Sequence, residues 1–140
     1  MTSLALLVAR IGLGVVFVAH GWQKFDDMGL AGTQASFAKM GAPAPELTAY
    51  YSTFVELVGG AALLIGAFTA VAGVLLVLDM LGAFLVVHID NGVFVTQGGY
   101  ELVVALGVGA LLVAVFGAGR YSVDGMLGRK VGRAAALSRS

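Results

Sequence analysis

Seven side chains at the ends of apolar segments have types and positions that could form one binding site. One apolar segment ends in His20-Gly21-Trp22-Gln23-Lys24, and a later one ends in His88-Ile89-Asp90-Asn91. An imidazole can hydrogen-bond a carbonyl group, shuttle a proton or ligate a metal, and a carboxylate can orient it or share its proton. The predicted site comprises His20, Trp22, Lys24, His88, Asn91, Tyr100 and Glu101.

The same residue types also gather at membrane boundaries without binding a ligand. Trp, Tyr, His and Lys have apolar bodies and polar tips, which suit the interface between lipid and water. The sequence therefore leaves an interfacial belt and a functional pocket both open. The two histidines could also bind haem or a metal ion, but they lack further ligands at a metal-site spacing, so we predict no metal.

A second set of polar residues lies inside the apolar segments: Arg10, Glu56 and Asp79. An ionisable side chain is costly in hydrocarbon, so it needs a partner or a task. Counted from the ends of their segments, Arg10 could reach Glu56 or Asp79, and a triad with one protonated carboxyl group would be neutral. We expect this buried charge network to hold helices together, with a proton relay or substrate anchor as the alternative.

These residues are set in a very apolar chain. Of its 140 residues, 59% are hydrophobic and 11% are charged, whereas soluble domains carry roughly 25% charged residues. A soluble domain of this size could not bury so much apolar surface. The 21 glycines suit close contacts between helices in a membrane.

Several kinds of chemistry are excluded by what the sequence lacks. The chain has no cysteine, which excludes disulfides, thiolate metal sites and cysteine redox relays within it. It has no phosphate-binding loop, HExxH motif or nucleophile elbow. Its basic stretch near the C-terminus is short and has no interleaved aromatic residues, so nucleic acid is not an expected partner.

Four apolar segments are long enough to be membrane-spanning helices, so we predict an all-α fold, an integral membrane four-helix bundle. A polar connection follows the first segment, and we expect it to form an outer loop with a short interfacial helix within it. The expected spans cover residues 4–20, 47–69, 70–90 and 100–119, and the outer loop covers residues 21–46.

The distribution of basic residues predicts the orientation. Arg129, Lys130, Arg133 and Arg139 lie in the last dozen residues, and such clusters stay on the cytoplasmic side of a membrane. Four spans place both termini on one side, so we expect both in the cytoplasm. The predicted division is a transmembrane domain of residues 1–120 and a basic cytoplasmic tail of residues 121–140.

Five short motifs follow one another along the chain: Arg10-Ile-Gly-Leu-Gly, Ala19-His20-Gly21-Trp22-Gln23-Lys24, Glu56-Leu-Val-Gly-Gly, Val87-His88 with Asn91-Gly92, and Gly98-Gly99-Tyr100-Glu101-Leu102. Their order and spacing resemble the DoxX family of small bacterial membrane proteins, over about residues 4–124. The resemblance implies a four-helix, multi-pass protein of the bacterial inner membrane. Asp79 departs from the family pattern, which has an apolar residue there. The matching positions are Arg10, His20, Lys24, Glu56, His88, Tyr100 and Glu101.

The resemblance also implies a redox function, because family members are often assigned to oxidoreductase or redox-stress complexes and include a subunit of thiosulfate:quinone oxidoreductase. We therefore expect a membrane subunit of a redox complex that binds a quinone, such as menaquinone, at the outer face. Its polar head would contact His20 and His88, while Lys24 and Glu101 would tune or relay protons. Electrons would come from a partner or a soluble reductant, because the chain has no cysteine and no recognisable cofactor motif.

Two other functions also fit the sequence. A non-catalytic scaffold or accessory subunit would use its helix faces and basic tail to dock other membrane or redox proteins. A small proton-coupled transporter would use Glu56 and Asp79 as proton sites. The lipid bilayer is the expected partner in each case, and the sequence leaves the formation of oligomers open.

Overall fold

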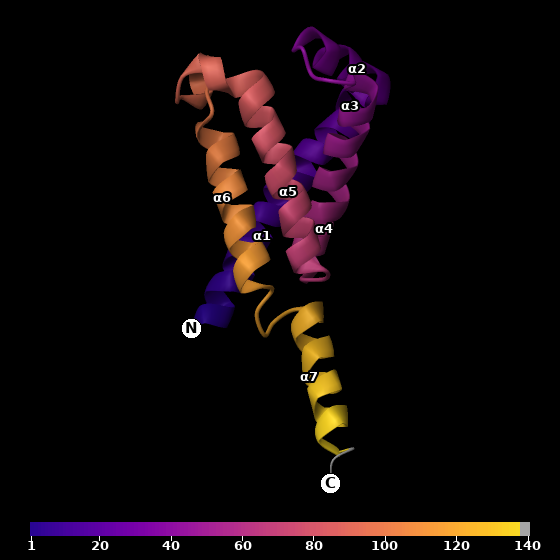
Figure 1. Cartoon of the computed structure of the whole chain (residues 1–140), viewed down its shortest axis with the longest axis vertical. Coiled ribbons are helices and arrows are strands. Elements are labelled where there is room, and N and C mark those ends of the chain that lie inside the picture. Colours follow the sequence, from indigo (N-terminus) through magenta and orange to yellow (C-terminus); the bar gives the residue numbers. More distant parts are fainter. Residues whose placement is uncertain (138–140) are drawn as a thin grey trace.

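The computed structural model describes residues 1–137, and every regular element in that part of the chain is helical (Figure 1). The all-α class is therefore confirmed. Ser138, Arg139 and Ser140 of the predicted tail lie outside the described residues. The elements are α1 (Thr2–Trp22), η1 (Gln23–Asp27), α2 (Gly29–Lys39), α3 (Pro45–Phe54), η2 (Val55–Gly59), α4 (Gly60–Ile65), α5 (Thr69–Ala83), η3 (Phe84–His88), η4 (Ile89–Asn91), η5 (Val95–Gln97), α6 (Glu101–Phe116) and α7 (Val123–Leu137).

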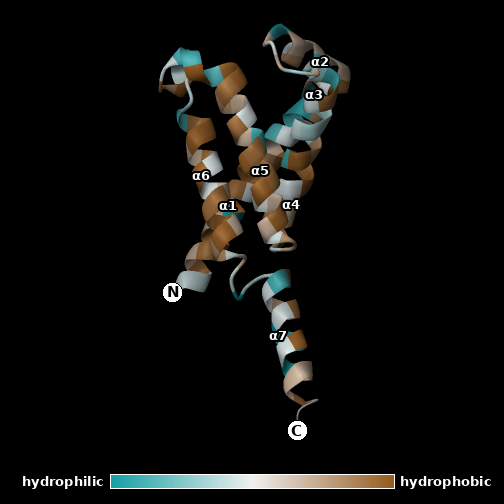
Figure 2. Cartoon of the chain, viewed as in Figure 1, coloured by the Kyte–Doolittle hydropathy of each residue, from teal (hydrophilic) through white to brown (hydrophobic). Residues whose placement is uncertain are grey.

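Within residues 1–137, three continuous helical stretches are long and apolar enough to cross a membrane: Thr2–Asp27, Pro45–Ile65 and Thr69–Asn91, with 26, 21 and 23 residues. Figure 2 shows that the bundle formed by these stretches and α6 is predominantly hydrophobic. Helix α6 is apolar but has only 16 residues, because Gly117 takes a positive φ of 77° and ends it. It is therefore shorter than the segment 100–119 that we predicted.

The backbones of α1 and the α3–α4 stretch touch at glycines. A Cβ atom on Gly14 would lie 2.8 Å from the Gly60 carbonyl oxygen, and one on Gly21 would lie 2.7 Å from the Leu57 amide nitrogen. Small residues allow this close approach between membrane helices. The contacts fix the register of the antiparallel pair, with Gly14 level with Gly60 and Gly21 level with Leu57.

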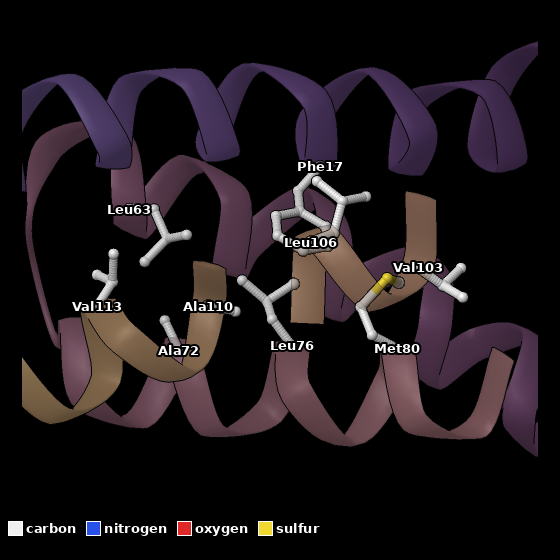
Figure 3. Close-up of a cluster of buried hydrophobic side chains, with 9 residues drawn as sticks. All are labelled: Phe17, Leu63, Ala72, Leu76, Met80, Val103, Leu106, Ala110 and Val113. Atoms are coloured by element: carbon white, nitrogen blue, oxygen red, sulfur yellow. The ribbon is translucent and has the colours of Figure 1, made fainter. Parts of the chain in front are cut away.

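The core lies where α1, α4, α5 and α6 meet. Figure 3 shows its buried hydrophobic side chains, which come from all four helices: Phe17, Leu63, Ala72, Leu76, Met80, Val103, Leu106, Ala110 and Val113. Many other large apolar side chains remain exposed on the outside of the bundle, such as Leu85 and Val115. That surface suits a lipid environment and would be unfavourable in water.

The N-terminus and the start of α7 lie at one end of the bundle, and α2 lies at the other (Figure 1). We call these the α7 end and the α2 end. At the α7 end, the Arg120 amide donates to Ser3 Oγ at 3.4 Å, which places the exit of α6 beside the beginning of α1.

Arg10 joins three segments at the α7 end. Its side chain is fully buried, and its Nη1 donates to the carbonyl oxygens of Leu63 at 2.7 Å and Leu64 at 3.2 Å. Its Nη2 donates to the Tyr121 carbonyl oxygen at 2.6 Å. Arginine thus supplies donors to carbonyls in the last turn of α4, where backbone donors run out. The Leu63 oxygen also accepts from the Gly66 amide at 3.2 Å.

The structure does not show the predicted pairing of Arg10 with Glu56 or Asp79. Arg10 lies 11 residues before Gly21 in α1, which is about 16 Å at about 1.5 Å per residue. Glu56 packs beside Gly21, so closely that a Cβ atom on this glycine would lie 3.1 Å from the Glu56 Cβ. Our depth count was wrong because α1 begins at Thr2 and α4 ends at Ile65, which brings Arg10 level with the end of α4.

Asp124 caps the beginning of α5 from α7. Its two carboxylate oxygens accept from the amides of Phe68 and Thr69, both at 2.9 Å, and its own amide donates to the Gly66 carbonyl at 2.9 Å. Partial burial opposes ionisation, but these hydrogen bonds and the charge of Arg10 outweigh it and lower the pKa of Asp124. The carboxylate therefore acts as a cap supplied by a distant segment.

Replacing Asp124 with alanine should destabilise the protein by about 1 kcal/mol at pH 7, the usual loss for a helix cap. A group whose pKa is lower in the folded state stabilises it above the unfolded pKa of about 3.9. This contribution disappears as pH falls through the folded pKa. The stability difference between wild type and Asp124→Ala should therefore shrink as the pH falls from about 3.9 through the folded pKa. Unfolding in mixed micelles at several pH values measures it, and a difference independent of pH would contradict the assignment.

Candidate functional site

A cavity of about 570 Å³ lies among α1, α2, α3, α5 and α6 toward the α2 end. Its walls are largely aliphatic and include Met40, Leu78, Val86, Leu102 and Leu106. Small-molecule sites commonly have such dimensions, with mainly hydrophobic walls and a few polar groups that fix orientation.

Five acidic or basic side chains line this one cavity: His20, Lys24, Glu56, Asp79 and His88. They come from α1, η1, η2, α5 and η3. Three of them, Lys24, Glu56 and His88, lie in π-helical turns. Such turns insert an extra residue into an α-helix, rotate the residues beyond it and occur frequently at functional sites.

Lys24, Glu56 and Asp79 form the charged part of the cavity. The Lys24 ammonium donates to Glu56 Oε2 in an ion pair, and the two side chains are 17% and 4% exposed. The Asp79 carboxyl group is buried, lies within hydrogen-bonding range of Glu56 and accepts from Ser52 Oγ at 3.3 Å. With one proton shared between the carboxyl groups, the three side chains carry no net charge, which favours their burial.

We expected Glu56 and Asp79 to belong to a separate, deeper group with Arg10, but they share the cavity with Lys24 and the histidines. The register between α1 and η2 explains this arrangement. Gly21 packs against Glu56 and Leu57, so the following turn of the helix, which carries Lys24, reaches the Glu56 carboxylate.

Each cavity histidine uses its Nδ1 atom in a backbone hydrogen bond. His20 Nδ1 lies 2.9 Å from the Val16 carbonyl oxygen, and His88 Nδ1 lies 2.6 Å from the Gly98 carbonyl oxygen. A carbonyl oxygen only accepts, so Nδ1 carries the proton in both rings. Nε2 is the nitrogen that remains for other interactions.

The other four residues of the predicted site do not line the cavity and have local roles. Trp22 is 51% exposed and contacts the Phe25 ring. Tyr100 packs edge-on against Phe84, with ring centroids 5.3 Å apart. Asn91 and Glu101 hold the α5–α6 connection: Asn91 Nδ2 donates to the Val87 carbonyl at 2.9 Å, and Glu101 Oε1 accepts from the Val95 amide at 2.7 Å. Glu101 therefore has a backbone partner in place of the histidine that we expected.

Sequence reasoning missed several residues that complete the cavity. Tyr51 and Ser52 line it from α3, and Phe37 and Met40 line it from the end of α2. Ser52 lies four residues before Glu56, a spacing that puts two side chains on one helix face and could have indicated it. Nothing in the sequence indicated that α2 would fold back over the α3 side of the bundle.

The fold and the cavity define an all-helical membrane protein with a mostly apolar cavity and a cluster of ionisable groups within it. The chain belongs to the DoxX family, whose model matches residues 5–89. It is a multi-pass protein of the bacterial inner membrane, in agreement with the names of its relatives.

Three relatives illustrate the similarity. The inner membrane protein YqjF of Escherichia coli (strain K12) is 32% identical over 131 residues, covering 93% of this chain and 97% of the relative. The inner membrane protein YphA of the same strain is 30% identical over 124 residues, with 85% and 87% covered. A Bacillus subtilis (strain 168) protein named "Putative oxidoreductase CatD" is 33% identical over 87 residues, and the match spans 62% of each chain. No solved structure matches the chain.

Proposed function

We propose that this protein is the membrane subunit of a redox complex and binds a quinone-type lipid in the cavity. The observation that carries the proposal is the convergence of His20, Lys24, Glu56, Asp79 and His88 on one cavity with aliphatic walls. Quinone-type lipids need this combination, because a polar aromatic head is joined to a long apolar tail. The oxidoreductase name of the Bacillus subtilis relative supports the redox part.

The proposed orientation places the α2 end at the outer face and the α7 end in the cytoplasm. Support comes from the basic residues Arg129, Lys130 and Arg133 in α7, because basic clusters stay on the cytoplasmic side. In this orientation α6 is the fourth span, tolerated despite its length by local thinning of the bilayer. The cavity then lies in the outer half of the membrane.

In the bound state the head of the ligand would lie beside the ionisable cluster, and its tail would follow the aliphatic wall of Leu78, Leu102 and Leu106. His20 and His88 would hydrogen-bond the head through Nε2. Lys24, Glu56 and Asp79 would accept or supply protons. Electrons would come from a partner protein, since the chain contains no cysteine to relay them.

The first test is to purify the protein in native-lipid nanodiscs, extract the lipids and search for quinones by mass spectrometry. Menaquinone, oxidised or anaerobically reduced, is then added while the melting temperature is followed. We expect quinone to co-purify and at least one redox state to raise the melting temperature. Absence of both effects would contradict the proposal and favour a scaffold or accessory role.

A pair of glycine variants tests where the ligand binds. Gly82 lines the cavity, and a Cβ atom there would meet nothing within 4 Å. Gly12 is equally open but lies in α1 outside the cavity lining. Gly82→Leu should fill part of the cavity and weaken menaquinone binding by about tenfold or more, equivalent to about 1.4 kcal/mol. Gly12→Leu should bind as wild type, and equal binding by both variants would place the ligand elsewhere.

A further inference from the structure

The directions of the hydrogen bonds around the cavity indicate which redox state of the ligand it recognises. We infer that the cavity binds the hydroxyl-bearing form, a lipophilic aromatic diol such as a quinol, more tightly than the corresponding quinone. This inference rests on the proposed function and deepens it. It follows from counting which polar atoms of the lining are already used within the protein.

The hydroxyl groups of the lining donate to protein acceptors. Tyr51 OH donates to the Leu75 carbonyl oxygen at 2.8 Å. Ser52 Oγ donates to Asp79 Oδ2 at 3.3 Å, and Thr48 Oγ1 lies 3.1 Å from the Pro43 carbonyl oxygen that accepts from it. A hydroxyl group has one proton to donate. These side chains therefore have no hydroxyl proton left for a ligand and can only accept a hydrogen bond from it.

The histidines offer acceptors in their neutral form. Their Nδ1–H groups are held by the carbonyls of Val16 and Gly98. In a neutral imidazole the second nitrogen then has a lone pair and no proton. Both Nε2 atoms are thus suited to receive a hydroxyl proton from a ligand.

The carboxyl groups of Glu56 and Asp79 add further acceptor oxygens. With one proton held between them, one of the two groups is ionised, and an ionised carboxylate offers about four lone-pair positions. Lys24 and Ser52 each occupy one acceptor position of the pair. Lys24 is the one side chain named here that keeps free donors. Its ammonium has three N–H groups, and one of them donates to Glu56. Acceptors therefore outnumber free donors around the cavity.

The two redox states of the ligand differ in how many hydrogen bonds they can donate. A quinone has two carbonyl oxygens and only accepts hydrogen bonds, whereas a quinol has two hydroxyl groups and can donate two. A quinol would satisfy two of the acceptors, but a quinone would displace water from them without replacing its hydrogen bonds. An unsatisfied buried acceptor is unfavourable, so the arrangement discriminates against the quinone.

The test compares menaquinol and menaquinone with one isoprene unit, measured anaerobically with the full chain in nanodiscs. A redox-inert pair removes any influence of electron transfer: 4-hexylresorcinol, which donates two hydroxyl protons, and its dimethyl ether, which donates none. We expect the hydroxyl form of each pair to bind about tenfold tighter or more, as one additional hydrogen bond to a charged acceptor would give.

The outcomes separate this inference from the proposed function. If no member of either pair binds, the proposed function fails and the inference fails with it. If both members of a pair bind equally, or the quinone and the dimethyl ether bind tighter, the proposed function stands and the inference is overturned.

A variant tests the acceptor role of Asp79 directly. Asp79→Asn replaces one carboxyl oxygen by an amide group that donates, so the preference for the hydroxyl form should fall several-fold. Asp124→Asn makes the same chemical change outside the cavity and should keep the full preference. Circular dichroism establishes that both variants are folded, and an unchanged preference in folded Asp79→Asn would overturn the acceptor role.

Discussion

Replacing Arg10 with leucine is expected to reduce the stability of the folded protein by about 3 kcal/mol or more. The guanidinium is fully buried and donates to the carbonyl oxygens of Leu63, Leu64 and Tyr121. Leucine would remove these hydrogen bonds, and a hydrogen bond that involves a charged group typically contributes about 1.5–3 kcal/mol. The Leu63 oxygen would keep only its hydrogen bond from the Gly66 amide, at 3.2 Å. The substitution would also remove one of the links between the segment after α6 and the end of α4, and the hydrogen bond from the Asp124 amide to the Gly66 carbonyl would remain.

Unfolding of the Arg10→Leu variant by SDS in mixed micelles measures this loss. Arg10→Lys serves as the comparison variant. Lysine keeps the positive charge, but its compact ammonium cannot reach three carbonyl oxygens as the planar guanidinium does. We expect an intermediate stability for it. Wild-type stability in Arg10→Leu would contradict the structural role of these hydrogen bonds. The folded fraction of the variant should bind the cavity ligand normally, because Arg10 does not line the cavity and lies 14 residues before Lys24.

Replacing Lys24 with methionine is expected to be comparably severe. Glu56 is 4% exposed and would lose its cationic partner. Removing one member of a buried ion pair typically costs about 3–5 kcal/mol because an uncompensated charge remains buried. Adding Glu56→Gln to Lys24→Met should restore part of the loss, since the double variant carries no unpaired charge at this position.

The four-member double-mutant cycle of Lys24→Met and Glu56→Gln separates the pair from its surroundings. Lys39→Met provides the matched control: Lys39 is an exposed lysine at the same end of the bundle, and its replacement should change stability by less than about 0.5 kcal/mol. Strictly additive losses in the cycle would show that the two side chains do not depend on each other, contrary to the structure.

Composition and apolar length were sufficient to predict the fold class. The long apolar segments around Arg10, Glu56 and Asp79 indicated helices in a membrane, because hydrocarbon allows few other backbone structures. The details that the sequence did not reveal are those set by packing. The Asp124 cap is such a detail, because it joins α7 to the left-handed residue Phe68 before α5.

The part of the site that depends on residue type and position in the chain could be predicted from the sequence. His20, Lys24 and His88 were expected in one site and do line one cavity. The partner of Lys24 was not predicted, because it depends on the register in which Gly21 meets Glu56. Trp22, Tyr100 and Glu101 were assigned to the same site from their nearness to the membrane boundary, but their neighbours in space are Phe25, Phe84 and the Val95 amide.

An experimental map of the protein purified with its native lipids would test the central claim most directly. We expect a ring-shaped density in the cavity, within hydrogen-bonding distance of His20 or His88, with a tail along Leu78 and Leu102. That density should disappear in Gly82→Leu and persist in Gly12→Leu. A cavity closed by side chains, or one that contains only an acyl chain pointing away from the ionisable cluster, would contradict the claim.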